Sequence, residues 1–183
     1  MNQRLFSFVG GDGGEWFVRQ QTTLAGAPLK NVTHVAVRSA GQQIDAASWV
    51  LQGVTSNDRY VERSEKDGLI AVQQGLGRSA THLAALIPIR KNADWWALTQ
   101  DERRDIFEAQ SRHIAIGMKY LPAIARKLHH CRDLSESAPF DFLTWFEFAP
   151  EYEPEFNNML EELRASPEWT YVDRELDFRL QRI

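Results

Sequence analysis

The second half of the sequence alternates segments of strand periodicity with segments of helix periodicity. Residues 82–90 are apolar almost throughout, while 140–148 and 169–183 alternate apolar and polar positions, as strands in a half-buried sheet do. Residues 153–165 place their apolar side chains on one helical stripe, and Thr99 begins a run with helix N-cap character. This order predicts an α+β fold, a ferredoxin-like antiparallel sheet with helices on one face.

The first third of the chain has a different pattern, with short β-branched or aromatic runs separated by Gly, Pro, Asn and Asp. These runs predict strands at 5–10, 15–19, 34–38 and 48–54. Sparse apolar positions at helical spacing predict a surface helix over 58–76. Because these strands are few and short, we expect residues 1–80 to form a shortened N-terminal ferredoxin-like lobe. Residues 81–183 then form the second lobe of one compact unit.

Two prolines bear on the predicted elements. Pro88 lacks the N–H that a ladder needs, so we expect it at an edge, an end or a bulge of its strand. The helix that begins after Thr99 should end at Pro122, and a second helical stretch is predicted over 123–130.

Composition excludes several classes of function. The chain has 183 residues and a net charge of −4, with acidic and basic residues interspersed, so no nucleic-acid partner is expected. Cys131 is the single cysteine, which excludes an intrachain disulfide and fits a reducing compartment. No apolar run reaches the ~18 residues of a membrane span, and the first residues lack the pattern of a signal peptide. We therefore expect a soluble, cytoplasmic protein with no membrane partner.

The candidate reactive residues are few, because phosphate-binding loops, serine elbows and zinc-protease motifs do not occur in the sequence. Among five histidines, His113 is distinctive because it lies one turn before Gly117 on an otherwise apolar helix face. A glycine there would let a flat ligand approach the backbone. From the residues alone, a buried core histidine is still favoured over a metal ligand.

Three segments together resemble the chlorite dismutase family, and in particular its short-chain dimeric branch. They are 85–96 (ALIPIRKNADWW), 111–130 (SRHIAIGMKYLPAIARKLHH) and 140–148 (FDFLTWFEF). The resemblance covers most of the chain from about Ser48 to the C-terminus. It is the combination of segments, and no single one, that is specific.

This resemblance implies a non-covalent haem b, a dimeric α+β barrel fold and a homodimer. His113 resembles the proximal iron ligand, Arg126 the distal arginine, and Glu168 the carboxylate bonded to the proximal imidazole. Gln73 resembles the glutamine that holds the arginine away from the iron, with Gln74 as a rival. The residues that resemble those lining the haem edge and propionates are Asn57, Tyr60, Lys91 and Trp95.

The implied reaction converts chlorite into chloride and dioxygen through a ferryl haem and hypochlorite, which must recombine before hypochlorite escapes. Arg126 suits this task because a guanidinium stays cationic and offers several donors to an oxyanion. His113 and Arg126 are 13 residues apart, so one straight helix would separate them by about 20 Å. We therefore expect the chain to break at Pro122, which would let Arg126 reach the opposite face of the haem.

Three alternatives remain at this point. A coproheme decarboxylase-like enzyme belongs to the same superfamily, but that branch resembles longer chains and generally lacks an arginine at the position of Arg126. A haem-binding protein without a catalytic role would have a similar pocket. A plain dimeric α+β barrel protein that binds a small organic ligand would keep His113 as a core residue.

Overall fold

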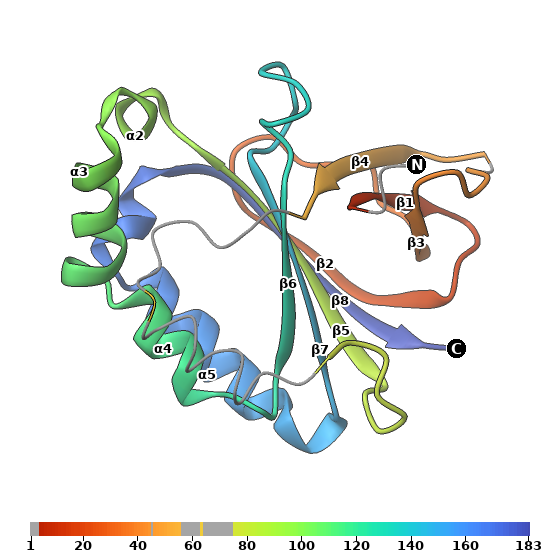
Figure 1. Ribbon diagram of the computed structural model, residues 1–183. Helices are drawn as coiled ribbons and strands as arrows, with labels where there is room; N and C mark the ends of the chain where they lie inside the picture. The colour runs from red at the N-terminus through yellow and green to blue at the C-terminus, as the bar shows by residue number, and fades with distance from the viewer. Residues whose placement is uncertain (1–3, 45, 56–62, 64–74) are drawn as a thin grey trace.

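The computed structural model describes residues 4–44, 46–55, 63 and 75–183, which form a closed antiparallel β-barrel with helices packed on one side (Figure 1). Around the barrel the strand order is β1-β3-β2-β8-β5-β7-β6-β4. The strands are β1 Leu5–Gly11, β2 Trp16–Ala25, β3 His34–Ser39, β4 Trp49–Val54, β5 Leu83–Lys91, β6 Ala125–His130, β7 Phe142–Phe148 and β8 Val172–Arg182. The predicted α+β barrel is confirmed, and the described strands before and after residue 80 belong to the same barrel. The division into two lobes stays a prediction.

The helices lie along the face of the sheet formed by β5, β6, β7 and β8, while β1, β3 and β4 lie on the other side of that sheet (Figure 1). They are α2 Ala93–Ala97, α3 Gln100–Arg104, the π-helix η1 Asp105–Gln110, α4 His113–Lys119, α5 Glu153–Arg164, and two short 3-10 helices, η2 Pro150–Tyr152 and η3 Pro167–Tyr171. As predicted, Thr99 is the N-cap of α3, and its backbone N–H donates to Glu102 Oε2 at 2.8 Å. None of the helices in these described ranges has the length and hydrophobicity of a membrane span.

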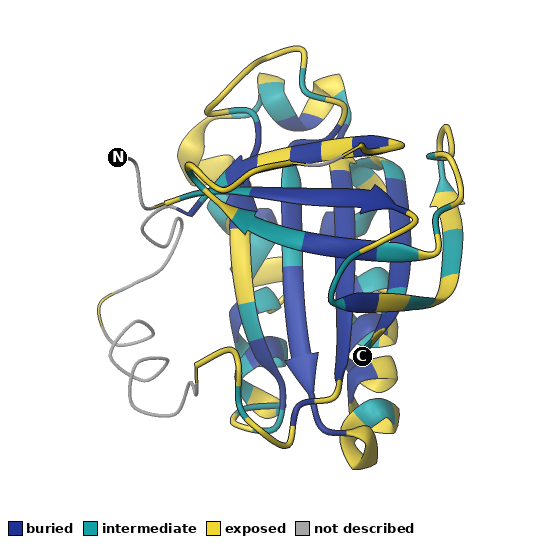
Figure 2. Ribbon diagram, turned by 90° about the vertical axis from the view of Figure 1, so that its right-hand side faces the viewer, coloured by how far each residue is buried: buried dark blue, intermediate teal, exposed yellow. Residues whose placement is uncertain are grey.

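Two separate apolar cores lie on the two faces of the sheet, because successive strand residues point to opposite sides. The barrel interior holds one core, which includes Phe8, Trp49, Leu86, Trp145 and Phe178. The second core lies between the sheet and the helices and includes Ile87, Ile124, Phe146, Phe148, Phe156, Met159, Leu160 and Leu163. Figure 2 shows largely buried strands in front of helices that expose residues on their outer surfaces.

The stripe predicted on 153–165 carries the second core, and its central member is Phe156. This ring is fully buried and packs at 4.5 Å from the Phe148 ring and 5.1 Å from the Phe146 ring. We expect Phe156→Ala to lower the free energy of unfolding by about 3–5 kcal/mol, because it leaves a cavity that rigid strands cannot fill. Urea unfolding measures the change, with Leu134→Ala, at an exposed position, as a control expected to stay within about 0.5 kcal/mol of wild type. Equal effects of the two substitutions would contradict this packing.

The chain between Thr99 and His130 differs from the prediction in two respects. The long helix is interrupted after η1, where Arg112 takes a left-handed conformation with φ of 52°, and α4 begins afresh at His113. Residues 125–130, predicted as helical, form strand β6, paired with β7. The Ala-Arg-Lys-Leu sequence has good helix propensity, but its ladder with β7 and the burial of Ala125 decide the conformation.

Pro88 also differs from its predicted place, because it lies inside a strand that has neighbours on both sides. It is in register with Leu143 of β7, while the ladder between β5 and β8 passes from Leu86 directly to Ile89. A proline has no N–H to donate, so the gap in the second ladder is where such a residue can be accommodated.

Candidate active site

His113 is held at the start of α4 by the chain that precedes it. Arg112 contributes no side-chain cap, and Glu108 Oε2 instead accepts the backbone N–H of Ile114 at 2.7 Å. The imidazole stacks on the Phe107 ring, with centroids 4.3 Å apart. The π-helix, the left-handed residue and the Glu108 cap therefore fix where this ring lies.

A buried carboxylate, Glu168, binds the inner nitrogen of this imidazole. Its Oε2 lies 2.7 Å from His113 Nδ1, and its Oε1 lies 2.8 Å from Lys91 Nζ. Its backbone N–H donates to the Oγ of buried Ser111 at 2.8 Å. Burial alone would raise the pKa of Glu168, but the contacts with His113 and Lys91 outweigh burial and lower that pKa to about 2. The carboxylate is thus ionised and accepts the Nδ1–H, which leaves Nε2 as the nitrogen with a free lone pair.

Lys91 lies behind this carboxylate. Its side chain is buried, and its ammonium lies 4.5 Å from the centroid of the buried Trp95 ring. Burial lowers the pKa of Lys91, against the opposing effect of the Glu168 charge. The structure thus brings Lys91 and Trp95 together with Glu168 in a buried group, and their contact with a haem edge stays a prediction.

Arg126 approaches α4 from the sheet. On β6 it is in register with Phe146, a residue of the core between sheet and helices, so it points to the same side as the helices. A Cβ added to Gly117 would lie 2.7 Å from Arg126 Nη1, so the guanidinium lies directly against α4, one helical turn beyond His113. The broken chain around Pro122 therefore brings both side chains to one region, although through a strand and not through a second helix.

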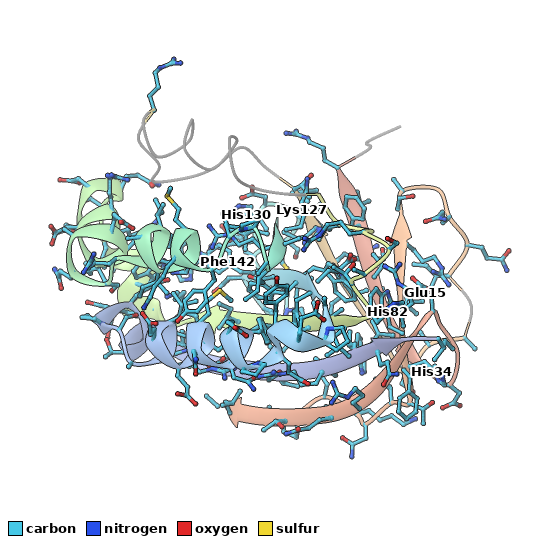
Figure 3. The ribbon with its side chains drawn as sticks, turned by 90° about the horizontal axis from the view of Figure 1, so that it is seen from below. Glu15, His34, His82, Lys127, His130 and Phe142 are labelled. Atoms are coloured by element: carbon cyan, nitrogen blue, oxygen red, sulfur yellow. The ribbon has the colours of Figure 1, made fainter. Side chains whose placement is uncertain are left out.

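Apolar and aromatic side chains surround this region on the sheet side. Leu128 and Thr144 are paired across β6 and β7, and Leu128 is 43% exposed although it lies on the helix side of the sheet. Next to them, His130 packs edge-on against Phe142 with ring centroids 5.5 Å apart. Figure 3 shows both rings towards the half of the molecule that holds the helices.

Some predicted site residues cannot be compared with the structure, and some contacts were not predicted. Asn57, Tyr60, Gln73 and Gln74 lie outside the described residues. The contacts that sequence reasoning missed are those of Phe107 with His113, of Ser111 with Glu168, and of Glu108 with the backbone of Ile114. Their one sequence signal is proximity to His113, which does not distinguish them from other residues of that helix.

The Arg126 guanidinium lies so close to Gly117 that the stability of a Gly117→Ala variant tests whether this guanidinium can move. We expect Gly117→Ala to leave the haem-free protein as stable as wild type or up to about 1 kcal/mol more stable, because alanine favours the helix and the guanidinium can move. Gly53→Ala is the matched control, since its Cβ would lie 2.8 Å from the Cβ of buried His129, which cannot move. Thermal unfolding should show a loss of stability only for Gly53→Ala. Destabilisation by Gly117→Ala as well would mean that the guanidinium is fixed.

The fold and this region together define a class: an α+β barrel protein in which a carboxylate-bound imidazole on a helix shares a region with an arginine from the sheet. Residues 16–182 match the family model described as chlorite dismutase. The chain belongs to the chlorite dismutase family, as its sequence motifs indicated.

Individual relatives agree with this assignment. The chain is 52% identical to the dimeric chlorite dismutase of Nitrobacter winogradskyi, with a TM-score of 0.91, covering 97% of this chain and 99% of that one. It is 32% identical over 123 residues to a chlorite dismutase of Ideonella dechloratans, a match that covers 66% of this chain but only 40% of that longer relative. Chlorite dismutase from Candidatus Nitrospira defluvii shares the fold, with 24% identity and a TM-score of 0.59 over 81% of this chain and 56% of that one.

Proposed function

We propose that this protein is a haem b-dependent chlorite O2-lyase, which converts chlorite into chloride and dioxygen and so detoxifies chlorite. The observation that carries the proposal is the grouping of the Glu168-bound His113 and Arg126 beside Gly117, in a member of this family. We further propose a homodimer, supported by the dimeric Nitrobacter winogradskyi relative, and a cytoplasmic location, supported by the reduced, buried Cys131.

The residues present fit a haem. The imidazole of His113 has its Nδ1 engaged, which leaves Nε2 available to an iron. Gly117 has no side chain, so a flat ring could approach α4 there once the Arg126 guanidinium moves aside. Leu128 offers exposed apolar surface from the sheet side. The sequence has no Cys-x-x-Cys-His motif, so the haem would be held without covalent attachment. When bound, haem supplies the redox-active iron that the conversion of chlorite requires.

His113 and Glu168, with Lys91 and Ser111 behind them, would hold the iron-binding imidazole in place. Glu168 accepts the Nδ1–H of His113, which fixes the ring orientation and increases the electron donation of the imidazole. Lys91 holds the other carboxylate oxygen, so the carboxylate cannot rotate away from the imidazole. Ser111 accepts the backbone N–H of Glu168 and fixes the segment that carries it.

Arg126 has a different task, which concerns the anions. A guanidinium is cationic at any working pH and presents several N–H donors to an oxyanion. In a region shielded from water it would retain the chlorine-containing anion near the reaction centre until dioxygen has formed. Its place against Gly117 also shows that the side chain reaches as far as α4.

The experiment that tests the proposal combines an absorption spectrum with an oxygen electrode. Purified protein is reconstituted with haem b, and chlorite is then added. We expect a Soret band, extraction of the haem into acidified organic solvent, and one dioxygen per chlorite over many turnovers before the haem bleaches. Absence of a Soret band would overturn haem binding. A Soret band without dioxygen would leave a haem protein with no lyase activity.

A second arm of this experiment separates the two branches of the superfamily. Coproheme and hydrogen peroxide are added to the haem-free protein, and mass spectrometry follows the porphyrin. We expect no haem b to form. Conversion of coproheme to haem b would assign the protein to the decarboxylase branch.

A further inference from the structure

A cavity of about 870 Å³ opens at one side of the barrel, between β1 and β6. Its inner wall is aromatic, with Phe8, Trp16 and Trp145 among the lining residues. Among the described residues, β4 and β6 are paired at Val54 and His130, and the first half of β6 borders the cavity. Arg126 and Lys127 both line the cavity.

The two acidic side chains of this cavity are already engaged within the protein. Glu15 binds Arg38 at 3.0 Å and accepts the backbone N–H of Val37 at 2.8 Å. Glu147 accepts Trp145 Nε1 at 3.0 Å and the Gly77 N–H at 2.6 Å, and also lies 3.7 Å from Arg182.

Lys127 differs from these residues, because it is exposed and no carboxylate of the described chain lies within ion-pair distance of it. Figure 3 shows it on β6, apart from Glu15. The neighbouring His129 adds no positive charge at neutral pH, since burial, reinforced by the charge of Lys127, lowers the pKa of its ring to about 4. Among the described residues that line the cavity, Lys127 therefore presents an exposed ammonium to a ligand.

Lys127 and Arg126 are neighbours on β6, and both line the cavity. Adjacent strand residues point to opposite faces, so Lys127, in register with Trp145, faces the barrel interior, whereas Arg126 faces the helices. Their Cα atoms are only about 3.8 Å apart. An anion that meets Lys127 therefore lies in the same cavity that Arg126 lines, next to the strand residue that carries its guanidinium.

We propose that this cavity is the entrance for small inorganic anions to the region of Arg126, and that Lys127 steers them into it. The protein carries a net charge of −4, so an anion approaching at random meets repulsion, and a local positive charge above apolar walls raises its concentration at the opening. The inference rests on the proposed function for the identity of the reacting anion. It concerns the entrance, however, and not the reaction.

The test measures association rates, because steering acts on encounter and not on chemistry. Azide, an anion, and imidazole, which is mostly neutral at mildly alkaline pH, are mixed with haem-loaded protein, and the Soret shift is followed by stopped flow. We expect Lys127→Gln to slow azide association about three- to tenfold at low ionic strength, and Lys127→Glu to slow it further. The dependence of the azide rate on salt should weaken in both variants, while the imidazole rate stays the same.

The matched control is Lys30→Gln, which removes the same charge from an exposed position that does not line the cavity. It should leave the azide rate within about twofold of wild type. An unchanged azide rate in Lys127→Gln, or equal slowing of azide and imidazole, would overturn the entrance proposal. These outcomes are distinct from failure of the proposed function, which would appear in wild-type protein as a missing Soret band or as absence of dioxygen.

Discussion

His113→Ala is expected to abolish stoichiometric haem binding. In the proposed function this imidazole would bind the iron, because Glu168 holds its Nδ1 and leaves Nε2 available. Loss of a residue that merely supports a metal ligand typically costs 10–100-fold in affinity, so loss of the ligand itself should cost more than about 100-fold. Titration of haem into the apoprotein, followed at the Soret band, measures this change.

Two controls make the result specific. His82→Ala removes an exposed histidine outside the region around α4 and should bind haem as wild type does. Added imidazole should partly restore the spectrum of His113→Ala, because the small molecule can occupy the space of the lost ring. A His113→Ala protein that keeps a full Soret band with the signature of a histidine ligand would show that another residue binds the iron.

The elements with a regular hydrophobic period could be predicted from the sequence. The stripe on 153–165 became α5, which buries Phe156, Met159, Leu160 and Leu163, and the apolar run at 82–90 became β5. Such patterns are informative because burial on one face leaves a fixed period in the sequence.

Strand β6 could not be predicted in the same way, because its extended conformation depends on pairing with β7 and not on its own sequence pattern. Residues 125–130 alternate poorly and contain good helix formers, and they become a strand through the ladder with β7. The consequence for the site is large, since a strand places Arg126 and Lys127 on opposite faces, which a helix would not do.

The contact between His113 and Glu168 shows what resemblance adds to residue patterns. The two side chains are 55 residues apart, and Glu168 alone reads as an exposed acid in a Ser-Pro-Glu turn. The family motif nevertheless indicated the pair, and the structure brings them within 2.7 Å. Lys91 was expected at the edge of the haem, and neither the motif nor the local sequence indicated that its ammonium would be buried against Glu168.

Arg126→Ala should lower kcat/KM for chlorite by about 100- to 1,000-fold while haem binding stays close to that of wild type. This magnitude is typical of removing one preorganised donor to an oxyanion from an active site. The kcat/KM of Arg126→Lys should lie between those of wild type and Arg126→Ala, because lysine keeps the charge but loses the planar arrangement of donors. Initial rates of dioxygen release give the comparison, and the Soret band gives the amount of loaded protein.

The control for this substitution is Arg19→Ala, which removes an arginine that pairs with Glu153 on the outside of the barrel. It should leave the rate unchanged, so a loss confined to the Arg126 variants would reflect position and not net charge. The products and the number of turnovers of Arg126→Ala also test the role of this arginine. If Arg126 retains the chlorine-containing anion until dioxygen forms, Arg126→Ala should release trappable hypochlorite and bleach after fewer turnovers than wild type. Rates and turnover numbers equal to those of wild type would remove this arginine from the reaction.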